Sequence, residues 1–175
     1  YHPNKDFPTL IRAFAKVRAE RPVRLVILGD AVPGNKRDKY FAGIDALIAE
    51  LGIQDDIDLP GFTINPYRYM RRAALFVLSS LREGFPNVLV EAMACGCPVV
   101  ATNCPHGPPE ILANGTFGPI VPMRDVDAMA EAITQTLDAP IPHERMRARA
   151  LEFTAERAVE RYEHILLNSP AGGAE

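Results

Sequence analysis

Short apolar segments alternate with longer amphipathic segments along the chain, and this alternation constrains the fold more than any other feature of the sequence. The short segments are rich in Val, Leu and Ile, which is typical of strands that are buried on both faces of a sheet. The longer segments show helical periodicity; Leu10, Ile11, Phe14 and Val17, for example, fall on one helical face. Strands separated by helices pair in parallel through right-handed crossovers. We therefore predict an α/β fold with a doubly wound, Rossmann-like parallel sheet.

Glycine, proline and polar residues mark the ends of these segments. Strands are expected at residues 24–28, 57–59, 75–78, 98–101 and 120–121. Helices are expected at 7–20, between the polar loop 30–37 and Gly52, and at 66–72, 86–95, 108–112, 126–138, 142–151 and 154–167. Asp6 is the expected N-cap of the first helix. Residues 1–167 are predicted to form one domain, and 168–175 a disordered tail.

Composition excludes several classes of protein. Hydrophobic residues make up 47% of the 175 residues, which excludes a disordered chain. No apolar run approaches the ~20 residues of a membrane-spanning helix, and no signal peptide opens the chain. The formal net charge of −3 gives no indication of a nucleic-acid partner, although a local basic pocket for phosphate stays compatible with it.

Three cysteines, Cys95, Cys97 and Cys104, lie within ten residues, with His106 close behind. A zinc site is one reading of this cluster, but zinc ligands usually come in tighter pairs. Packing around the end of a helix and the start of a strand explains the spacing more simply. Reduced thiols are the rule in cytosolic proteins, and we expect a cytoplasmic location.

Two glutamates, Glu83 and Glu91, stand eight residues apart on either side of a helix start. Glu83 follows a strand, in a loop broken by Gly84 and Pro86, and Glu91 lies about one turn inside the next helix. The N-terminus of that helix offers unpaired backbone N–H groups and a positive dipole end. In a doubly wound sheet this edge, at the carboxyl ends of the strands, is where ligands bind. The sequence therefore predicts an anion site with a carboxylate on each flank, which suits a sugar nucleotide.

Each glutamate also has a simpler explanation. Glu83 alone would be read as a solvated loop residue, and Glu91 as a helix-surface residue or an ion-pair partner of Arg82. The apolar neighbours Val88 and Ala94 predict that the face of Glu91 turns inward, where an unpaired charge is costly. That cost favours a ligand role for Glu91, such as a bidentate grip on the two ribose hydroxyls.

The segment from Glu83 to Glu91 resembles the E-x7-E motif of retaining glycosyltransferases of family 4, which have the two-domain GT-B fold. The resemblance covers nearly the whole chain and includes three further segments in the family's order. These are KDFPTLIRAFAKV from Lys5, LPGFTINPYRYM from Leu59 and CPHGPPEIL from Cys104. It implies the C-terminal, donor-binding half of a GT-B enzyme that transfers a hexose-type sugar from a nucleotide diphosphate-sugar to a glycan or lipid-linked acceptor.

The resemblance also implies roles for single residues. Glu83 would lie near the anomeric carbon, where it orients the sugar and stabilises developing positive charge. Lys5 matches the family's diphosphate-binding lysine. The turn Gly84, Phe85, Asn87, Val88 and Leu89 would carry the diphosphate, with free N–H groups from about Asn87 to Leu89. Phe62 is placed to stack on the base or to lie in the core, and His106 to touch the sugar or phosphate. Pro109 stands where relatives often carry an arginine.

We expect no metal and no cofactor besides the donor. The acidic groups Asp55-Asp56 and Asp125-Val126-Asp127 lie in a loop and at a helix start, and the second is better explained as an N-cap region. Lys5 would instead balance the charge of the leaving diphosphate.

Family members have a strand and a Gly-Arg pair before the point where this chain begins. The resemblance therefore predicts that the first strand, and the acceptor-binding amino-terminal domain, lie outside this sequence, and it leaves membrane association of the full protein open. Two other functions fit the same motifs: a nucleotide-sugar binding module without catalysis, and another GT-B enzyme such as a sugar-nucleotide epimerase or a phosphorylase. The epimerase would need further carboxylates from the missing half. The phosphorylase would need a pyridoxal-phosphate lysine, and the lysines cluster early in the chain.

Overall fold

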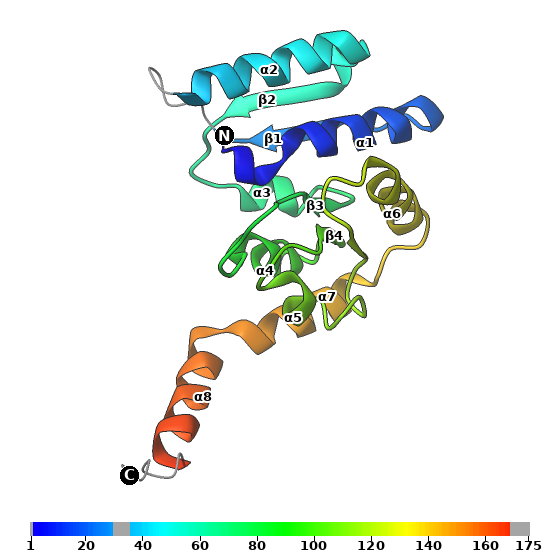
Figure 1. Ribbon diagram of the computed structural model, residues 1–175. Coiled ribbons are helices and arrows are strands. Elements are labelled where there is room, and N and C mark those ends of the chain that lie inside the picture. Colours follow the sequence, from blue (N-terminus) through cyan, green and yellow to red (C-terminus); the bar gives the residue numbers. More distant parts are fainter. Residues whose placement is uncertain (1, 30–35, 169–175) are drawn as a thin grey trace.

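The computed structural model describes residues 2–29 and 36–168, which form an α/β fold of parallel strands and covering helices (Figure 1). The strands are short and match the predicted apolar segments to within one or two residues. They are β1 (Leu25–Leu28), β2 (Ile57–Gly61), β3 (Phe76–Leu78), β4 (Val99–Thr102) and β5 (Ile120–Val121).

The helices also follow the predicted order. They are α1 (Phe7–Glu20), α2 (Lys36–Leu51), α3 (Tyr67–Met70), α4 (Asn87–Ala94), α5 (Pro108–Ile111), α6 (Val126–Asp138), α7 (His143–Ala150) and α8 (Ala155–Asn168). Three short 3₁₀ helices occur at Pro3–Lys5, Gln54–Asp56 and Leu151–Phe153. The tail predicted at 168–175 lies outside the described residues, apart from Asn168 at the end of α8.

Asp6 occupies the predicted N-cap position of α1, but the mechanism of capping differs from the prediction. Its backbone is left-handed, with φ of 46°, and its side chain makes no capping hydrogen bond. The Oδ2 atom of Asp6 is buried and accepts no hydrogen bond within the described part of the chain. Asp125 does cap as predicted, because its carboxylate accepts a hydrogen bond of 2.9 Å from the N–H of Ala128 at the start of α6.

All described strand pairs are parallel, but they belong to two sheets. In the first, β1 pairs with β2, and in the second the order is β3-β4-β5. Phe76 lies opposite Val99, and Ala101 lies opposite Ile120, so β4 is the central strand of the second sheet. Because the sheets do not pair with each other, β1 and β3 are both edge strands in this structure.

A slot separates these two edge strands. It has a volume of about 1130 Å³ and is lined along its length by residues 22–28 and 73–80, with α1 and α6 contributing apolar side chains. The lining also includes Ser79 and Ser80, which directly follow β3, together with His2, Lys5 and Val88. This cavity therefore runs between the sheets, and its lining includes Lys5 of the predicted site but neither Glu83 nor Glu91.

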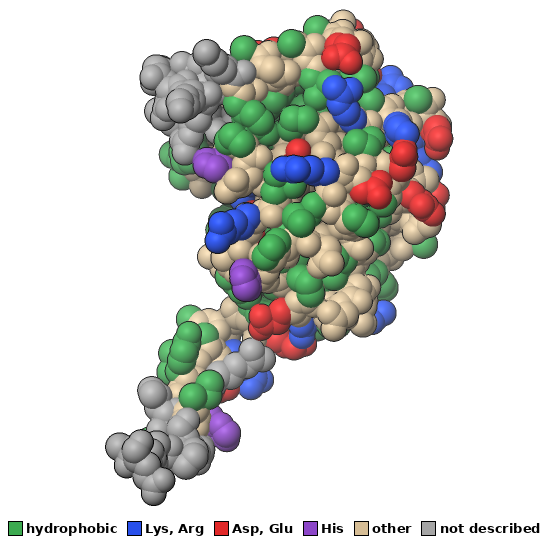
Figure 2. All heavy atoms as spheres, in the orientation of Figure 1, with side chains coloured by type: hydrophobic (Ala, Val, Ile, Leu, Met, Phe, Trp, Pro, Cys, Tyr) green, Lys and Arg blue, Asp and Glu red, His purple; other side chains and the backbone are tan. Residues whose placement is uncertain are grey.

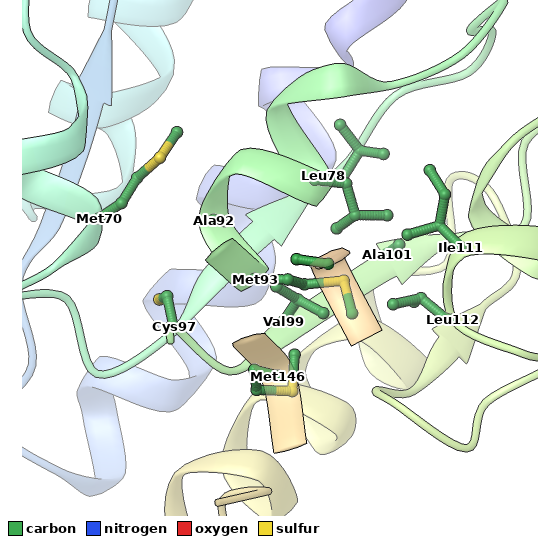
Figure 3. Close-up of a cluster of buried hydrophobic side chains, with 12 residues drawn as sticks. Met70, Leu78, Ala92, Met93, Cys97, Val99, Ala101, Ile111, Leu112 and Met146 are labelled. Atoms are coloured by element: carbon green, nitrogen blue, oxygen red, sulfur yellow. The ribbon is translucent and has the colours of Figure 1, made fainter. Parts of the chain in front are cut away.

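Helices cover both faces of the second sheet, as the doubly wound class requires. Successive β4 residues show this division, since Val99 and Val100 are both buried but belong to different apolar clusters. Val99 packs with α4 and α7 around Met93 and Met146, the cluster drawn in Figure 3. Val100 packs with α1 and α6, around residues such as Met129. A third cluster joins α1 and α2 to the β1–β2 sheet, and Figure 1 shows α2 lying along that sheet.

The last helix, α8, extends away from the rest of the molecule (Figure 1). Its exposed apolar side chains include Val159, Tyr162, Ile165 and Leu167. Acidic and basic side chains are interspersed on the face shown in Figure 2 rather than gathered by sign. Among the described residues, no helix has the length and apolar character needed to cross a membrane.

Candidate functional site

The site is centred on an ion pair between two predicted residues that are 78 positions apart in the sequence. Lys5 ends the short helix before α1, and its Nζ donates to Oε1 of Glu83 at 2.7 Å. The Glu83 side chain is 15% exposed and that of Lys5 is 41% exposed, so the carboxylate is the more enclosed partner. The fold thus brings a cation and a carboxylate together where β3 ends, at the edge where sheets of this class bind ligands.

Backbone contacts hold the two segments of this pair together. The N–H of Leu81 donates to the carbonyl oxygen of Asn4 at 2.7 Å, and the hydroxyl of Ser79 donates to the carbonyl oxygen of Lys5 at 2.6 Å. Ser80 donates from its hydroxyl to Oε1 of Glu83 at 2.6 Å. The geometry of the ion pair is therefore fixed by the loop after β3 and not only by two long side chains.

The turn into α4 is tighter than predicted. Pro86 has φ of −78° and ψ of 78°, close to an inverse γ-turn, and the Asn87 N–H donates to the carbonyl of Phe85 at 2.9 Å. The Leu89 N–H donates to the carbonyl of Pro86 at 2.8 Å. The prediction of free N–H groups throughout Asn87–Leu89 is therefore wrong at both ends. Val88, between them, has no such turn bond, and the side chain of Leu89 is fully buried in the core.

Glu91 lies in the second turn of α4 and is half-buried. Within the described part of the chain its carboxylate takes part in no ion pair or hydrogen bond, so the alternative pairing with Arg82 is not formed. The inward orientation predicted from its neighbours is only partly correct, because Val88 is half-buried but Ala94 is exposed. Glu91 thus lies at the boundary between core and solvent, without a partner among the residues that the structure describes.

A second turn packs directly against the first. It follows β4 and contains exposed His106, with φ of 63°, and buried Gly107, with φ of 98°. A Cβ atom on Gly107 would lie 2.2 Å from Cδ of Pro86. Glycine is therefore required here for a close approach as well as for its backbone conformation. This contact places His106 on the loop next to the Glu83–α4 turn.

The two aromatic residues predicted for the site, Phe62 and Phe85, lie in different surroundings: Phe62 is largely exposed, whereas Phe85 contacts another ring. Phe62 follows β2 and is 74% exposed, so the core alternative for this residue is wrong. No described contact joins Phe62 to the other predicted residues. Phe85 is 42% exposed, and its ring lies 5.9 Å, centroid to centroid, from Phe153 near the end of α7. The Phe85 side chain thus packs toward the C-terminal segment, while its carbonyl shapes the turn into α4.

All three cysteines are free thiols, of which Cys97 and Cys104 are buried and Cys95 is half-buried. Burial raises the pKa of Cys97 to about 12, and its Sγ contacts the carbonyl oxygen of Ala73 at 3.6 Å. Burial also raises the pKa of Cys104, with a smaller contribution from the nearby charge of Glu83. Within the described residues, no three His, Cys, Asp or Glu side chains are grouped as metal ligands.

Several residues at the site escaped sequence reasoning. They are Ser79 and Ser80, and the buried Thr102, which donates from β4 to the carbonyl oxygens of Leu78 and Ser80. The two serines follow an apolar strand and could have been read as its polar end, but the partner of each hydroxyl depends on segments far away in the sequence.

Comparison with known proteins identifies the family. The family model "Glycosyl transferases group 1" matches residues 1–153. The chain belongs to this family. It is 36% identical over 134 residues to N-acetylgalactosamine-N,N'-diacetylbacillosaminyl-diphospho-undecaprenol 4-alpha-N-acetylgalactosaminyltransferase of Campylobacter jejuni, an alignment that covers 77% of this chain and 34% of that protein. It is 32% identical to N-acetyl-alpha-D-glucosaminyl L-malate synthase of Bacillus anthracis, covering 92% of this chain and 42% of the relative.

Solved structures agree with this assignment. The Anabaena protein HepE, solved in complex with UDP and glucose, superposes with a TM-score of 0.82 at 25% identity, over 97% of this chain and 46% of that one. This group 1 glycosyltransferase chain therefore shares its fold with a UDP-binding protein. It spans less than half the length of the relatives named here.

Proposed function

We propose that this chain is the donor-binding domain of a retaining glycosyltransferase, which transfers a hexose-type sugar from a nucleotide diphosphate-sugar to a glycan or lipid-linked acceptor. The observation that carries the proposal is the 2.7 Å contact between Lys5 and Glu83 beside the start of α4, in a chain of the group 1 family. A cation, a carboxylate and a helix N-terminus next to each other match a diphosphate that carries a sugar.

Lys5 supplies positive charge for the diphosphate. Its ammonium group has three donors, and Glu83 takes only one of them in this structure. A diphosphate that arrives at the start of α4 can accept from the others, so that Lys5 bridges the phosphate and Glu83. The same charge stabilises the leaving diphosphate when the bond to the sugar breaks, and the proposed reaction accordingly needs no metal.

Glu83 and Glu91 have different tasks in this proposal. Glu83, held by Lys5, faces the sugar, where its negative charge stabilises the positive charge that develops at the anomeric carbon. Glu91, which has no partner among the described residues, accepts hydrogen bonds from the two ribose hydroxyls. Val88 offers its N–H to a phosphate oxygen, and Gly84 lets the backbone approach closely. His106 reaches the sugar or phosphate from the neighbouring turn, and Phe62 lies on the base side.

The rest of the transferase is proposed to lie in a longer protein that contains this chain. The slot between the edge strands β1 and β3 has a largely apolar lining and a volume of about 1130 Å³, in which we place a further strand. A parallel strand there would join the two sheets into one continuous doubly wound sheet, and an amino-terminal domain would supply the acceptor site.

Titration with UDP, GDP and ADP, with and without EDTA, tests the proposal on this chain. We expect weak binding of at least one nucleotide that is unchanged by EDTA. Glu91→Ala should weaken it by roughly 10- to 100-fold, the loss of charge-assisted hydrogen bonds worth about 1.5–3 kcal/mol. Glu20→Ala, a change at an exposed glutamate on α1, is the control and should have no effect. If no nucleotide binds, or if both variants bind like the unchanged chain, the proposal is wrong.

A further inference from the structure

Two adjacent serines just after β3 are buried although both are polar. Ser79 is 4% exposed and Ser80 is not exposed at all. Their hydroxyls serve different partners: Ser79 donates to the carbonyl oxygen of Lys5, and Ser80 donates to Oε1 of Glu83, both at 2.6 Å. Each half of the central ion pair is thus held by one of the two serines, through the backbone of Lys5 and through the side chain of Glu83.

The contacts of Glu83 are unequally divided between its two carboxylate oxygens. Oε1 accepts from Ser80 at 2.6 Å and from Lys5 at 2.7 Å. Oε2 accepts no hydrogen bond from any residue that the structure describes. It is not among the buried polar atoms, so it stays accessible. One oxygen is therefore anchored from two directions, and the other keeps its lone pairs for a ligand.

Ser80 is itself held in place by the sheet. Thr102 of β4 is fully buried, and its hydroxyl contacts the carbonyl oxygen of Ser80 and, at 3.3 Å, that of Leu78. The backbone of Ser80 is thereby tied to the neighbouring strand before the loop begins. Such support from a rigid element limits the movement of the hydroxyl and of the carboxylate bonded to it.

We propose that Ser80 is a positioning residue of the donor site, which fixes Oε1 of Glu83 so that Oε2 faces the sugar of a bound nucleotide-sugar. Ser80 is fully buried and acts only through Glu83, without contact to the ligand. This inference rests on the proposed sugar-facing role of Glu83. It differs from a merely structural role, in which the hydroxyl only satisfies a buried carboxylate, because it ties Ser80 to recognition of the sugar and not of the nucleotide.

The hydrogen bond is tested first without any ligand. Urea unfolding of the unchanged chain, Ser80→Ala, Glu83→Ala and the double variant forms a double-mutant cycle, in which each single change removes one partner of the hydrogen bond. We expect the two changes to be coupled by about tenfold in the unfolding equilibrium constant, the usual range for a hydrogen bond to a charged group. Additive effects would show that Ser80 does not hold Glu83, and would overturn the proposal whatever the chain binds.

The positioning role is tested by comparing matched ligands. The affinities for UDP and UDP-glucose, and for GDP and GDP-mannose, are measured for the unchanged chain, Ser80→Ala and Thr136→Val. Thr136→Val removes a hydroxyl that is buried in α6 and bonds to the carbonyl oxygen of Ala132, away from the site. We expect Ser80→Ala to lower the affinity for the sugar nucleotide by about three- to tenfold and to leave that for the free nucleotide unchanged. The control should leave both affinities unchanged.

The outcomes separate this inference from the proposed function. If the unchanged chain binds none of the four ligands, the proposed function fails and the positioning role fails with it. If the chain binds them and Ser80→Ala weakens nucleotide and sugar nucleotide equally, or neither, the proposed function stands and the positioning role is refuted.

Discussion

Replacing Gly107 by alanine tests how firmly the two loops of the site are locked together. The new Cβ would lie 2.2 Å from Cδ and 3.1 Å from Cγ of Pro86, and Gly107 has φ of 98°. A Cβ in a left-handed conformation costs about 1–2 kcal/mol. Overpacking against the proline ring adds about 1–3 kcal/mol. The free energy of unfolding should therefore fall by roughly 2–5 kcal/mol, which lowers Tm by about 4–20 °C for a chain of this size.

Two controls separate the terms in this prediction. Gly115 has a similar φ of 101°, but a Cβ there would meet nothing nearer than the Gly118 carbonyl oxygen at 4.0 Å. Gly115→Ala should consequently show the backbone cost alone, about 1–2 kcal/mol. Pro86→Ala removes the ring atoms and leaves the Pro86 nitrogen, at 3.5 Å, as the nearest remaining contact. In the double variant Pro86→Ala/Gly107→Ala, most of the stability that Gly107→Ala loses to overpacking should be regained.

Urea unfolding monitored by circular dichroism measures all four variants. Equal losses for Gly107→Ala and Gly115→Ala would refute the reasoning, since they would show that the Pro86 contact costs nothing. A double variant that is destabilised by the full sum of its two single changes would refute it as well.

The remaining predictions concern the thiols and the slot. Cys97 and Cys104 should resist iodoacetamide at pH 8 in the folded chain, whereas half-buried Cys95 reacts first; early labelling of Cys97, read by mass spectrometry, would contradict its burial. Because the pKa of Cys97 is raised from 9.0 to about 12, its contribution to stability should be constant below pH 9 and decline as pH rises toward 12, which pH-dependent unfolding of a Cys97→Ala variant measures. The slot should bind the apolar dye ANS in this chain but not in a longer protein that supplies the proposed strand, and equal dye fluorescence from both would contradict that proposal.

The fold was largely predictable because its signals are local. Helical periodicity in α1, short Val- and Leu-rich strands, and glycine at Gly52 and Gly96 after α2 and α4 define the elements without any tertiary information. The class of the sheet followed from their alternation. The division of the strands into two sheets could not be predicted from this alternation, because strand pairing depends on which strand edges meet in space.

The site was predictable only in part, for a similar reason. The spacing of Glu83 and Glu91 indicated a carboxylate on each side of the helix start, and the family resemblance added Lys5. Which N–H groups in that turn are free depends on the backbone angles of Pro86, which the sequence does not state. The contact between Gly107 and Pro86, and the hydroxyl of Ser80 on Glu83, join segments that only the folded chain brings together.

Amide NMR of this chain, titrated with UDP and with GDP, tests directly whether a diphosphate binds between Lys5 and the start of α4. The ¹⁵N–¹H signals of Gly84, Val88 and Glu91, and the side-chain ammonium of Lys5, should shift in proportion to occupancy, while those of α8 stay unchanged. Shifts confined to the slot between β1 and β3, or no shift at the start of α4 with either nucleotide, would contradict a diphosphate bound between Lys5 and that helix.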